Sequence, residues 1–261
     1  MNRANIIKSI IFAAAALAVG GAWADSEKVG GYTWTYRIIN GDTAEIYNNG
    51  SAAISPEPTG PVTIPSTLGG KPVTSIGYYA FSSCSGLTSV TIPDLVTSIG
   101  YSAFFGCSGL EEITLPFVGA RRGNTGSSDS VFGYIFGSSS YSGGTETRQY
   151  YSPYSLVFDF SSYSDYYIPS KLKKVVITDE NVLGSGAFRG CSDLTSVTIP
   201  DSVTSIGDYA FYNCSGLTSV TIPDSVTSIG DKAFYNCSGI RDVTVPQYVL
   251  DYGGEIGRAH V

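Results

Sequence analysis

Apolar and polar positions alternate in a short motif that recurs along much of the chain. Within residues 217–223, Leu217, Val220 and Ile222 are apolar, whereas the Thr and Ser residues among them are polar. This alternation predicts a short β-strand with its apolar side chains facing inward, because successive strand residues point to opposite faces. Pro223 has no N–H group to donate to a neighbouring strand, so we expect the strand to end there.

A second apolar segment follows each predicted strand. Val226 and Ile229 form an apolar corner, and the glycine after them permits a turn at little steric cost. Ala233, Phe234 and Cys237 then occupy positions i, i+1 and i+4, which share one face of a helix. The pattern therefore predicts one short strand, one corner and one short helical turn per unit. No such unit can bury its apolar face alone, so the units must stack on one another.

The unit repeats almost verbatim every 23 residues. The strings CSGLTSVTIPDLVTSIGYSAFFG, CSDLTSVTIPDSVTSIGDYAFYN and CSGLTSVTIPDSVTSIGDKAFYN begin at Cys84, Cys191 and Cys214, and one interval of 84 residues interrupts the spacing of the cysteines. This period lies within the roughly 20–29 residues of leucine-rich repeats and predicts a solenoid. Stacking should bring equivalent side chains together, and the expected core residues are Cys84, Cys107, Cys191, Cys214, Cys237, Phe81, Phe104, Phe188, Phe211 and Phe234.

Seven segments fit the strand motif, and they divide the chain into regions. They are Val62–Pro65, Val90–Pro93, Ile113–Pro116, Val175–Thr178, Val197–Pro200, Val220–Pro223 and Val243–Pro246. We therefore expect leucine-rich repeats over residues 61–116 and 169–250. Residues 25–60 contain two β-rich halves around Asn40 and Gly41, which is a strong hairpin signal. We expect this segment to form a β-hairpin cap, since an uncovered first repeat would expose its core.

The pattern LxxVxIPxxVxxIGxxAFxxC resembles the BspA-like leucine-rich repeats, also called the Treponema pallidum type, and the resemblance extends from about Pro61 to Tyr248. It implies an α/β-type leucine-rich repeat solenoid of the kind found in surface proteins of gut and oral bacteria and of some parasitic protists. It also implies adhesion, by non-covalent contact with host matrix proteins or neighbouring cells.

Both ends of the chain carry segments that we exclude from the predicted fold. Residues 1–24 combine basic residues, a short apolar run and small residues before Ala24, which is the pattern of a secretory signal peptide cleaved after Ala24. The apolar run is shorter than the roughly 20 residues of a membrane span. We therefore expect a secreted or cell-surface protein with no membrane span. Residues 251–261 form a tail, in which 255–261 break the pattern and back-translate to a sequence resembling a sequencing-library adapter.

Residues 117–168 interrupt the repeats with a segment rich in Ser, Gly and Tyr. Insertions in solenoids form loops on one face, often the binding face, so we expect this segment to project from one edge. Tyr and Arg are enriched in interaction surfaces. The candidate ligand-binding residues are therefore Arg121, Arg122, Tyr134, Tyr141, Arg148, Tyr150, Tyr151, Tyr154 and Tyr163. The alternative interpretation is a spacer that covers the adjacent repeats.

Composition and charge argue against several classes of function. The net charge is −7 and only 14% of residues are charged, which disfavours nucleic acid because phosphates need a basic surface. The single histidine, His260, lies in the excluded tail, so we expect no enzyme, no cofactor and no metal site. The shared slot of the cysteines favours free buried thiols over disulfides. The strand Thr and Ser residues form a hydroxyl face, which provides either solubility or a repetitive binding surface.

The sequence therefore predicts an exported, non-enzymatic leucine-rich repeat protein. Its expected function is cell-surface adhesion, or binding of a protein or glycan, through a rigid solenoid and the Tyr-rich insertion. One alternative is a structural spacer within a longer surface protein. Another is the non-catalytic module of a larger exported enzyme.

Overall fold

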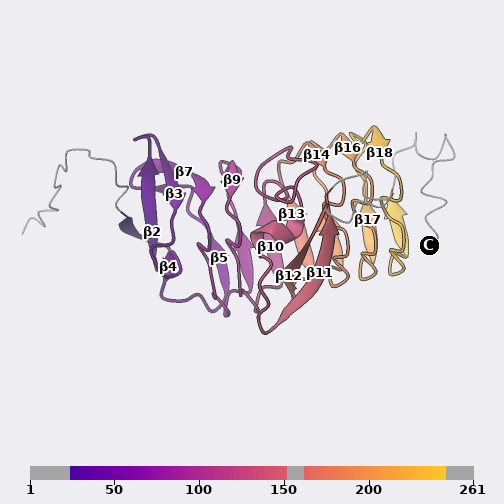
Figure 1. Cartoon of the computed structure of the whole chain (residues 1–261). Coiled ribbons are helices and arrows are strands. Elements are labelled where there is room, and N and C mark those ends of the chain that lie inside the picture. Colours follow the sequence, from indigo (N-terminus) through magenta and orange to yellow (C-terminus); the bar gives the residue numbers. More distant parts are fainter. Residues whose placement is uncertain (1–23, 152–161, 245–261) are drawn as a thin grey trace, which may run out of the picture.

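The computed structural model describes residues 24–151 and 162–244, which form an elongated stack of short strands and turns (Figure 1). Nearly all of the predicted signal peptide and the whole tail lie outside these residues. Apart from one 3₁₀ helix, η1 (Phe132–Ile135), the regular elements in the described part of the chain are strands. No helix there is long and apolar enough to cross a membrane.

The strands of the motif lie parallel along the stack in two adjoining sheets, here together called the first ladder. Five strands pair in the order β5 (Pro61–Thr63), β8 (Ser89–Thr91), β10 (Glu112–Leu115), β13 (Lys174–Ile177) and β15 (Ser196–Thr198), and β17 (Ser219–Thr221) pairs with β19 (Asp242–Thr244). In this register Val62, Val90, Ile113, Val175 and Val197 lie side by side. The seven strands that the motif predicts are confirmed, and each begins one residue earlier than expected.

In most repeats the apolar corner is also a strand, which the sequence pattern did not predict. In this second ladder, β7 (Lys71–Ile76) pairs with β9 (Ser98–Ile99), and β14 (Val182–Leu183), β16 (Ser205–Ile206) and β18 (Ser228–Ile229) pair in that order. All of these pairs are parallel. A typical repeat therefore contributes two short strands on different sides of the core, rather than one.

The expectation of a short helical turn in each repeat is wrong. In residues 77–84, the Phe81 N–H donates to the Ala103 carbonyl and the Ser83 N–H to the Phe105 carbonyl, both at 2.7 Å and both in the next repeat. The N–H groups that alternate with them, those of Ala80, Ser82 and Cys84, each donate to the carbonyl three residues back within the same turn. An α-helix would direct every N–H to the residue four positions back, leaving none for the neighbouring repeat. Stacking therefore selects a series of turns over a helix.

These turns need two left-handed residues in each repeat. The pairs with positive φ are Tyr79 and Ser83, Ser102 and Gly106, Gly186 and Gly190, Tyr209 and Asn213, and Lys232 and Asn236. Glycine and asparagine adopt this conformation readily, whereas a residue with a large side chain loses roughly 1–2 kcal/mol. The first position of the pair nevertheless holds Tyr or Lys in three repeats.

A column of stacked aromatic rings runs through the core. The ring centroids of Phe81 and Phe104 lie 5.0 Å apart, those of Phe188 and Phe211 5.2 Å, and those of Phe211 and Phe234 5.0 Å. In each of these pairs the rings are within 9° of parallel. All ten phenylalanines and cysteines expected in the core are buried. Identical units therefore bury equivalent side chains against each other, as the period of the sequence predicts.

The five cysteines are free and buried beside this column. Three of them donate from Sγ to a carbonyl of the preceding repeat at 3.0–3.1 Å, in the pairs Cys107–Phe81, Cys214–Phe188 and Cys237–Phe211. Burial raises the pKa of all five thiols, to about 12 for Cys84 and about 11 for Cys237. The slot suits cysteine because its side chain is small and apolar yet can weakly satisfy a carbonyl.

The N-terminal cap is a small antiparallel sheet that merges with the second ladder. Its strands are β1 (Asp25–Val29), β2 (Tyr32–Ile39), β3 (Thr43–Ile46) and β4 (Ile54–Ser55); β3 pairs in parallel with β7, which also pairs with β6 (Thr67–Leu68). Asn40 and Gly41 turn the chain between β2 and β3 with φ of 51° and 77°. Trp34 is 1% exposed, and its ring lies edge-on to Phe81 at 6.1 Å. The cap thus closes one end of the aromatic column.

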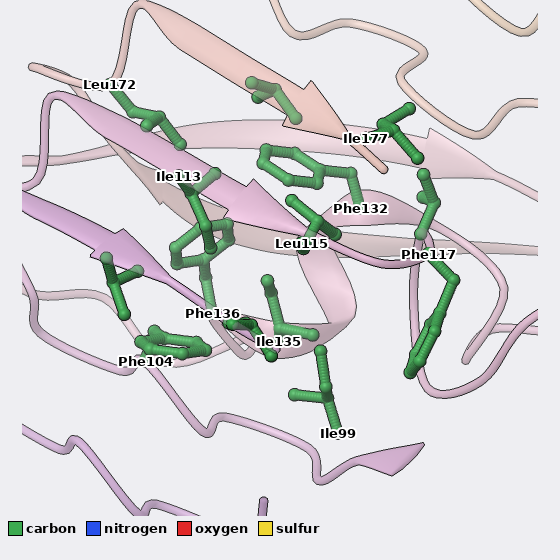
Figure 2. Close-up of a cluster of buried hydrophobic side chains, with 14 of the residues drawn as sticks. Ile99, Phe104, Ile113, Leu115, Phe117, Phe132, Ile135, Phe136, Leu172 and Ile177 are labelled. Carbon is green, nitrogen blue, oxygen red and sulfur yellow. The ribbon is translucent and has the colours of Figure 1, made fainter. Parts of the chain in front are cut away.

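The segment 117–168, expected to project as an insertion, begins inside the stack. The helix η1 directs Phe132, Ile135 and Phe136 into the core near Phe104 and the strands of the first ladder (Figure 2). The Phe104 N–H donates to the Ile135 carbonyl at 2.9 Å, and the Phe132 N–H donates to the Ala187 carbonyl at 2.8 Å. This helix therefore takes the place of a turn, and residues 112–136 complete a repeat that lacks the usual motif.

The later part of this segment forms a β-hairpin that crosses the middle of the stack (Figure 1). Its strands, β11 (Gly144–Tyr150) and β12 (Tyr163–Pro169), are antiparallel. The chain enters the hairpin after the η1 turn and afterwards reaches β13, which pairs directly with β10. The hairpin is therefore inserted between two consecutive strands of the first ladder without separating them.

Candidate binding surface formed by the hairpin and the last repeats

The hairpin has one face on the stack and one toward solvent. Opposite residues of the two strands share a face, so Thr147 lies with Tyr166 on the inner side, and both are buried. On the outer side, the Arg148 guanidinium donates two hydrogen bonds to Asp165, at 2.7 and 2.9 Å. The rings of Tyr150 and Tyr163 lie 5.3 Å apart next to this pair. The outer face thus presents aromatic and charged groups on a firmly docked support.

Gln149 fixes the hairpin to the stack through a side chain that is completely buried. Its amide oxygen accepts from the Gly133 N–H at 2.6 Å. Its amide nitrogen donates to the carbonyls of Ala187 and Arg189, at 3.4 and 3.2 Å. A buried amide loses its hydrogen bonds to water, so these bonds hold the hairpin in one position.

Two glycines permit the close approach of the hairpin. A Cβ atom on Gly186 would lie 1.8 Å from the Tyr150 carbonyl oxygen, and one on Gly133 would lie 2.5 Å from the Tyr166 side chain. Gly186 stands at the left-handed position that Tyr209 and Lys232 occupy in the next two repeats. The repeat pattern is therefore altered where the hairpin docks, because a side chain there would collide with it.

The outer face of the hairpin continues onto the turns of the following repeats. We name the combined region the tyrosine–arginine surface, and it consists of Arg148, Tyr150, Tyr163, Arg189, Tyr209, Tyr212, Lys232 and Tyr235. The Arg189 guanidinium lies 4.0 Å from the ring centroid of Tyr150 and 4.7 Å from that of Tyr212. The rings of Tyr212 and Tyr235 stack at 5.2 Å. Contacts between neighbours thus link the hairpin to the last two complete turns.

Arg189 is the electrostatic centre of this surface. It is half-buried, and no carboxylate in residues 24–151 or 162–244 forms an ion pair with it. A third ring, that of Tyr209, lies 5.2 Å from the guanidinium. Loss of water by burial lowers the pKa of Arg189, although arginine stays protonated at physiological pH. The result is a positive charge held among aromatic rings, where cation–π attraction partly replaces hydration.

Tyr209 and Lys232 extend the surface at two of the left-handed positions. Tyr209 is 5% exposed, and burial raises its pKa. The Lys232 ammonium lies 5.7 Å from the Tyr209 ring centroid, and its hydrogen bond with that phenol raises the pKa of Lys232. Both residues have φ above 50°. The chain therefore keeps large side chains at backbone positions where glycine would be less strained.

The candidate binding residues proposed from the sequence fall into separate groups. Arg148, Tyr150 and Tyr163 come together in the tyrosine–arginine surface. Tyr151 directly follows Tyr150 in the chain. Tyr154 lies outside the described residues. The remaining four, which are Arg121, Arg122, Tyr134 and Tyr141, lie elsewhere on the segment.

Three of these four residues have structural partners of their own. Arg122 forms an ion pair with Asp179, and Arg121 lies on the same exposed loop. The Tyr134 ring packs against Tyr101 at 5.4 Å, and burial raises the pKa of Tyr134 to about 12. The Tyr141 hydroxyl donates to the Tyr167 carbonyl at 2.9 Å. The geometry thus ties Arg122, Tyr134 and Tyr141 to neighbouring structure rather than to the tyrosine–arginine surface.

Five residues of the surface were not among the sequence-based candidates: Arg189, Tyr209, Tyr212, Lys232 and Tyr235. They belong to repeats, which were interpreted as scaffold. The sequence does mark these positions, because they differ between repeats that are otherwise nearly identical: GAFRG, DYAFYN and DKAFYN share only the Ala-Phe pair. Solvent-facing positions that vary within an otherwise repeated unit are where a scaffold can carry specificity.

Some hydroxyl groups of the repeats are engaged by the backbone. Thr195, Thr218 and Thr227 donate from their hydroxyls to carbonyls of the preceding repeat at 3.1–3.2 Å. The Asn236 amide donates to the Asn213 amide oxygen at 2.8 Å in the same manner. These hydroxyl hydrogens already have acceptors, so the face has fewer free donors than its composition indicates.

Within the described residues, no group of three or more His, Cys, Asp and Glu side chains is arranged to hold a metal ion. The Asp94 carboxylate accepts a hydrogen bond from the Thr178 hydroxyl.

Comparison with known families identifies the repeat. The family described as the BspA type leucine rich repeat region matches residues 62–124 and 157–256, in six copies. The chain belongs to this BspA-type family. The resemblance noted in the motif is therefore confirmed, with a fold of repeated strands and almost no helix. No curated protein matches the chain.

Several solved structures resemble this BspA-type chain. A leucine rich cell surface protein from Faecalibacterium prausnitzii is 26% identical and has a TM-score of 0.41, over 84% of this chain and 54% of that one. A leucine rich repeat protein of T. pallidum is 20% identical over 82% of this chain and 80% of that one, with a TM-score of 0.37. One from Eubacterium ventriosum is 22% identical over 80% and 50%, with a TM-score of 0.43. The chain spans about half the length of the first and third of these proteins.

Proposed function

We propose that this protein is an exported, non-enzymatic adhesion module that binds an acidic segment of a partner protein through the tyrosine–arginine surface. The observation that carries the proposal is Arg189, a half-buried cation that three tyrosine rings surround and that no described carboxylate neutralises. Export is supported by the signal-peptide pattern of residues 1–24.

The composition of the surface favours a protein partner. Tyrosine buries a large rigid area while losing little conformational entropy, and arginine is frequent among residues that dominate binding energy. The rings of Tyr150, Tyr212 and Tyr235 are partly or well exposed around the cation. A carboxylate from a partner would pair with Arg189 while adjacent apolar groups cover the rings.

Charge supports the acidic character of the partner. The whole chain carries a net charge of −7, yet Arg148, Arg189 and Lys232 gather in this one region. Asp165 neutralises Arg148 and Asp231 lies beside Lys232, so the charge of Arg189 is the one that a partner would meet. An acidic segment would be repelled by most of the molecule and attracted here, which gives orientation as well as affinity. The hydrated Thr and Ser of the repeats gain less from contact because they exchange one hydrogen bond for another.

The test is binding of the folded chain to a panel of matrix proteins and acidic peptides by biolayer interferometry. Arg189→Gln retains length and polarity but removes the charge, and Tyr212→Ala removes one enclosing ring. Each should weaken binding by at least about ten-fold, as loss of a central interface residue does. Binding should also weaken with added salt because Arg189 remains partly exposed.

A matched control is Leu95→Ala, because Leu95 is 54% exposed and lies outside the surface. That variant should bind like the parent chain. Equal binding by Arg189→Gln, Tyr212→Ala and the parent would contradict the proposed site. Absence of binding by the parent chain to every probe would favour the structural spacer.

A further inference from the structure

A pocket lies at the other end of the stack, where the cap meets the first turns. Its volume is about 380 Å³, within the range of roughly 300–1,000 Å³ for small-molecule pockets. Arg37 and Glu45 lie opposite each other on β2 and β3, and Tyr47 and Asn48 follow β3. The turn of the first repeat completes the lining with Tyr78 and Tyr79.

The polar groups of this pocket are paired and held in place. Arg37 donates from Nε to a Glu45 carboxylate oxygen, and its guanidinium lies 4.4 Å from the Tyr47 ring centroid. The Asn48 amide nitrogen donates to the Tyr79 carbonyl at 2.8 Å, and its oxygen accepts from the Gly50 N–H at 2.7 Å. These bonds join the loop after β3 to the turn, so the pocket is formed before any ligand enters.

The chemistry of the lining is that of a site for a neutral, hydroxyl-rich ligand. The Arg37–Glu45 pair places donors and acceptors side by side while its charges cancel, which suits adjacent hydroxyl groups and offers no net attraction to an ion. Tyr78 and Tyr79 are 64% and 41% exposed at the rim. Flat exposed rings of this kind pack against the C–H face of a sugar, and Tyr79 keeps its place despite a φ of 54°.

We propose that this pocket binds a neutral saccharide, with one or two sugar rings between the tyrosines and the Arg37–Glu45 pair. The site is separate from the tyrosine–arginine surface: it is formed by the cap and the first turn, whereas that surface is formed by the hairpin and the later repeats. Its ligand is also of a different class, since the net charge of its paired groups is zero. The two proposals can therefore fail independently.

The experiment measures saccharide binding to the full chain by saturation-transfer NMR and calorimetry. The neutral probes are lactose and N,N′-diacetylchitobiose, and the acidic probe is sialyllactose. The parent chain should transfer saturation to ring C–H protons of at least one neutral sugar, with no gain from the sialic acid. Tyr78→Ala removes the most exposed ring and should weaken binding of the neutral probe about ten-fold or more.

A second variant tests the charge balance. Glu45→Gln keeps the shape of the side chain but leaves Arg37 without its counter-charge, so the preference should shift by about ten-fold toward sialyllactose. Leu95→Ala is the control for an exposed apolar residue away from the pocket, and thermal unfolding establishes that each variant is folded. No transfer to either neutral sugar, unchanged binding by Tyr78→Ala, or a preference of the parent chain for sialyllactose would each overturn the proposal.

Discussion

Truncation of one ring in the aromatic column should destabilise the protein strongly. Phe211 is fully buried, and its ring is stacked on both sides, at 5.2 Å from Phe188 and 5.0 Å from Phe234. Phe→Ala substitutions in protein cores cost about 3–5 kcal/mol in free energy of unfolding. Phe211→Ala removes two stacked ring pairs, and each pair contributes about 0.5–1.5 kcal/mol in addition to the burial of apolar surface. We therefore expect a loss near the upper end of that range, at about 4–5 kcal/mol.

Position in the column provides an internal comparison. Phe234 is 8% exposed and stacks on a single described ring, that of Phe211. Phe234→Ala should therefore cost less, at about 3 kcal/mol. Phe211→Leu retains most of the apolar volume but loses both stacked pairs, so it should cost about 1–3 kcal/mol, which distinguishes loss of the stacked ring from loss of side-chain volume.

Urea unfolding followed by circular dichroism measures these differences from the midpoint and slope of the transition. The expected order of destabilisation is Phe211→Ala, then Phe234→Ala, then Phe211→Leu. A cost below about 1 kcal/mol for Phe211→Ala would refute the stacked column, because such values are typical of surface substitutions. Equal losses of unfolding free energy for Phe211→Ala and Phe234→Ala would show that the second stacked ring beside Phe211 adds no stability.

Two further predictions concern the thiols and the docking of the hairpin. In denaturant without reductant, a thiol reagent should react with all five cysteines. In the native protein it should hardly react, because burial raises the pKa of each thiol. Only one reactive thiol after denaturation would indicate two disulfides. Gly186→Ala should displace the hairpin and increase its proteolysis, since the new Cβ would lie 1.8 Å from the Tyr150 carbonyl oxygen. Gly126→Ala is the control, because Gly126 also has positive φ but no atom within 4 Å of such a Cβ, and equal proteolysis of both variants would exclude a steric cause.

The first ladder and the core could be predicted because both follow from a local apolar pattern that recurs in nearly identical units. Leu217, Val220 and Ile222 alternate with polar residues before a proline, and this local pattern has one physical interpretation. The near-identity of the units then dictates which side chains meet. Stacking requires no knowledge of distant contacts, since each unit touches the next one along the chain.

Two features of the repeat were misread for a common reason. The spacing of Ala233, Phe234 and Cys237 fits one face of a helix, but it also fits turns in which alternate N–H groups bond to the next repeat. The second ladder was missed because strands of two residues, such as β16, are too short for a period to be visible. In both cases hydrogen bonds between units, rather than the pattern within one unit, decide the backbone conformation.

The repeat at residues 112–136, which lacks the usual motif, and the tyrosine–arginine surface both depend on contacts between segments that no repeated pattern in the sequence relates. Phe132 and Phe136 complete the aromatic column from a segment without the Ala-Phe-x-x-Cys spacing, so the segment was interpreted as an insertion throughout. Arg189 meets Tyr150 only because Gln149 docks the hairpin on that turn. A contact between two segments far apart in the chain leaves no periodic signal in either one.

The place at which the hairpin enters the stack bears on how such proteins can diversify. Glu112 pairs with Lys174 in the register that joins every other pair of the first ladder, although the hairpin lies between them in the chain. The crossing between two repeats therefore accepts an added segment without disturbing either neighbour. Recombination between nearly identical 23-residue units could add or remove whole repeats beyond this crossing. As long as the two repeats after the hairpin are retained, such length changes would leave the geometry around Arg189 intact. The length of the stack and the specificity of the binding surface could therefore evolve separately.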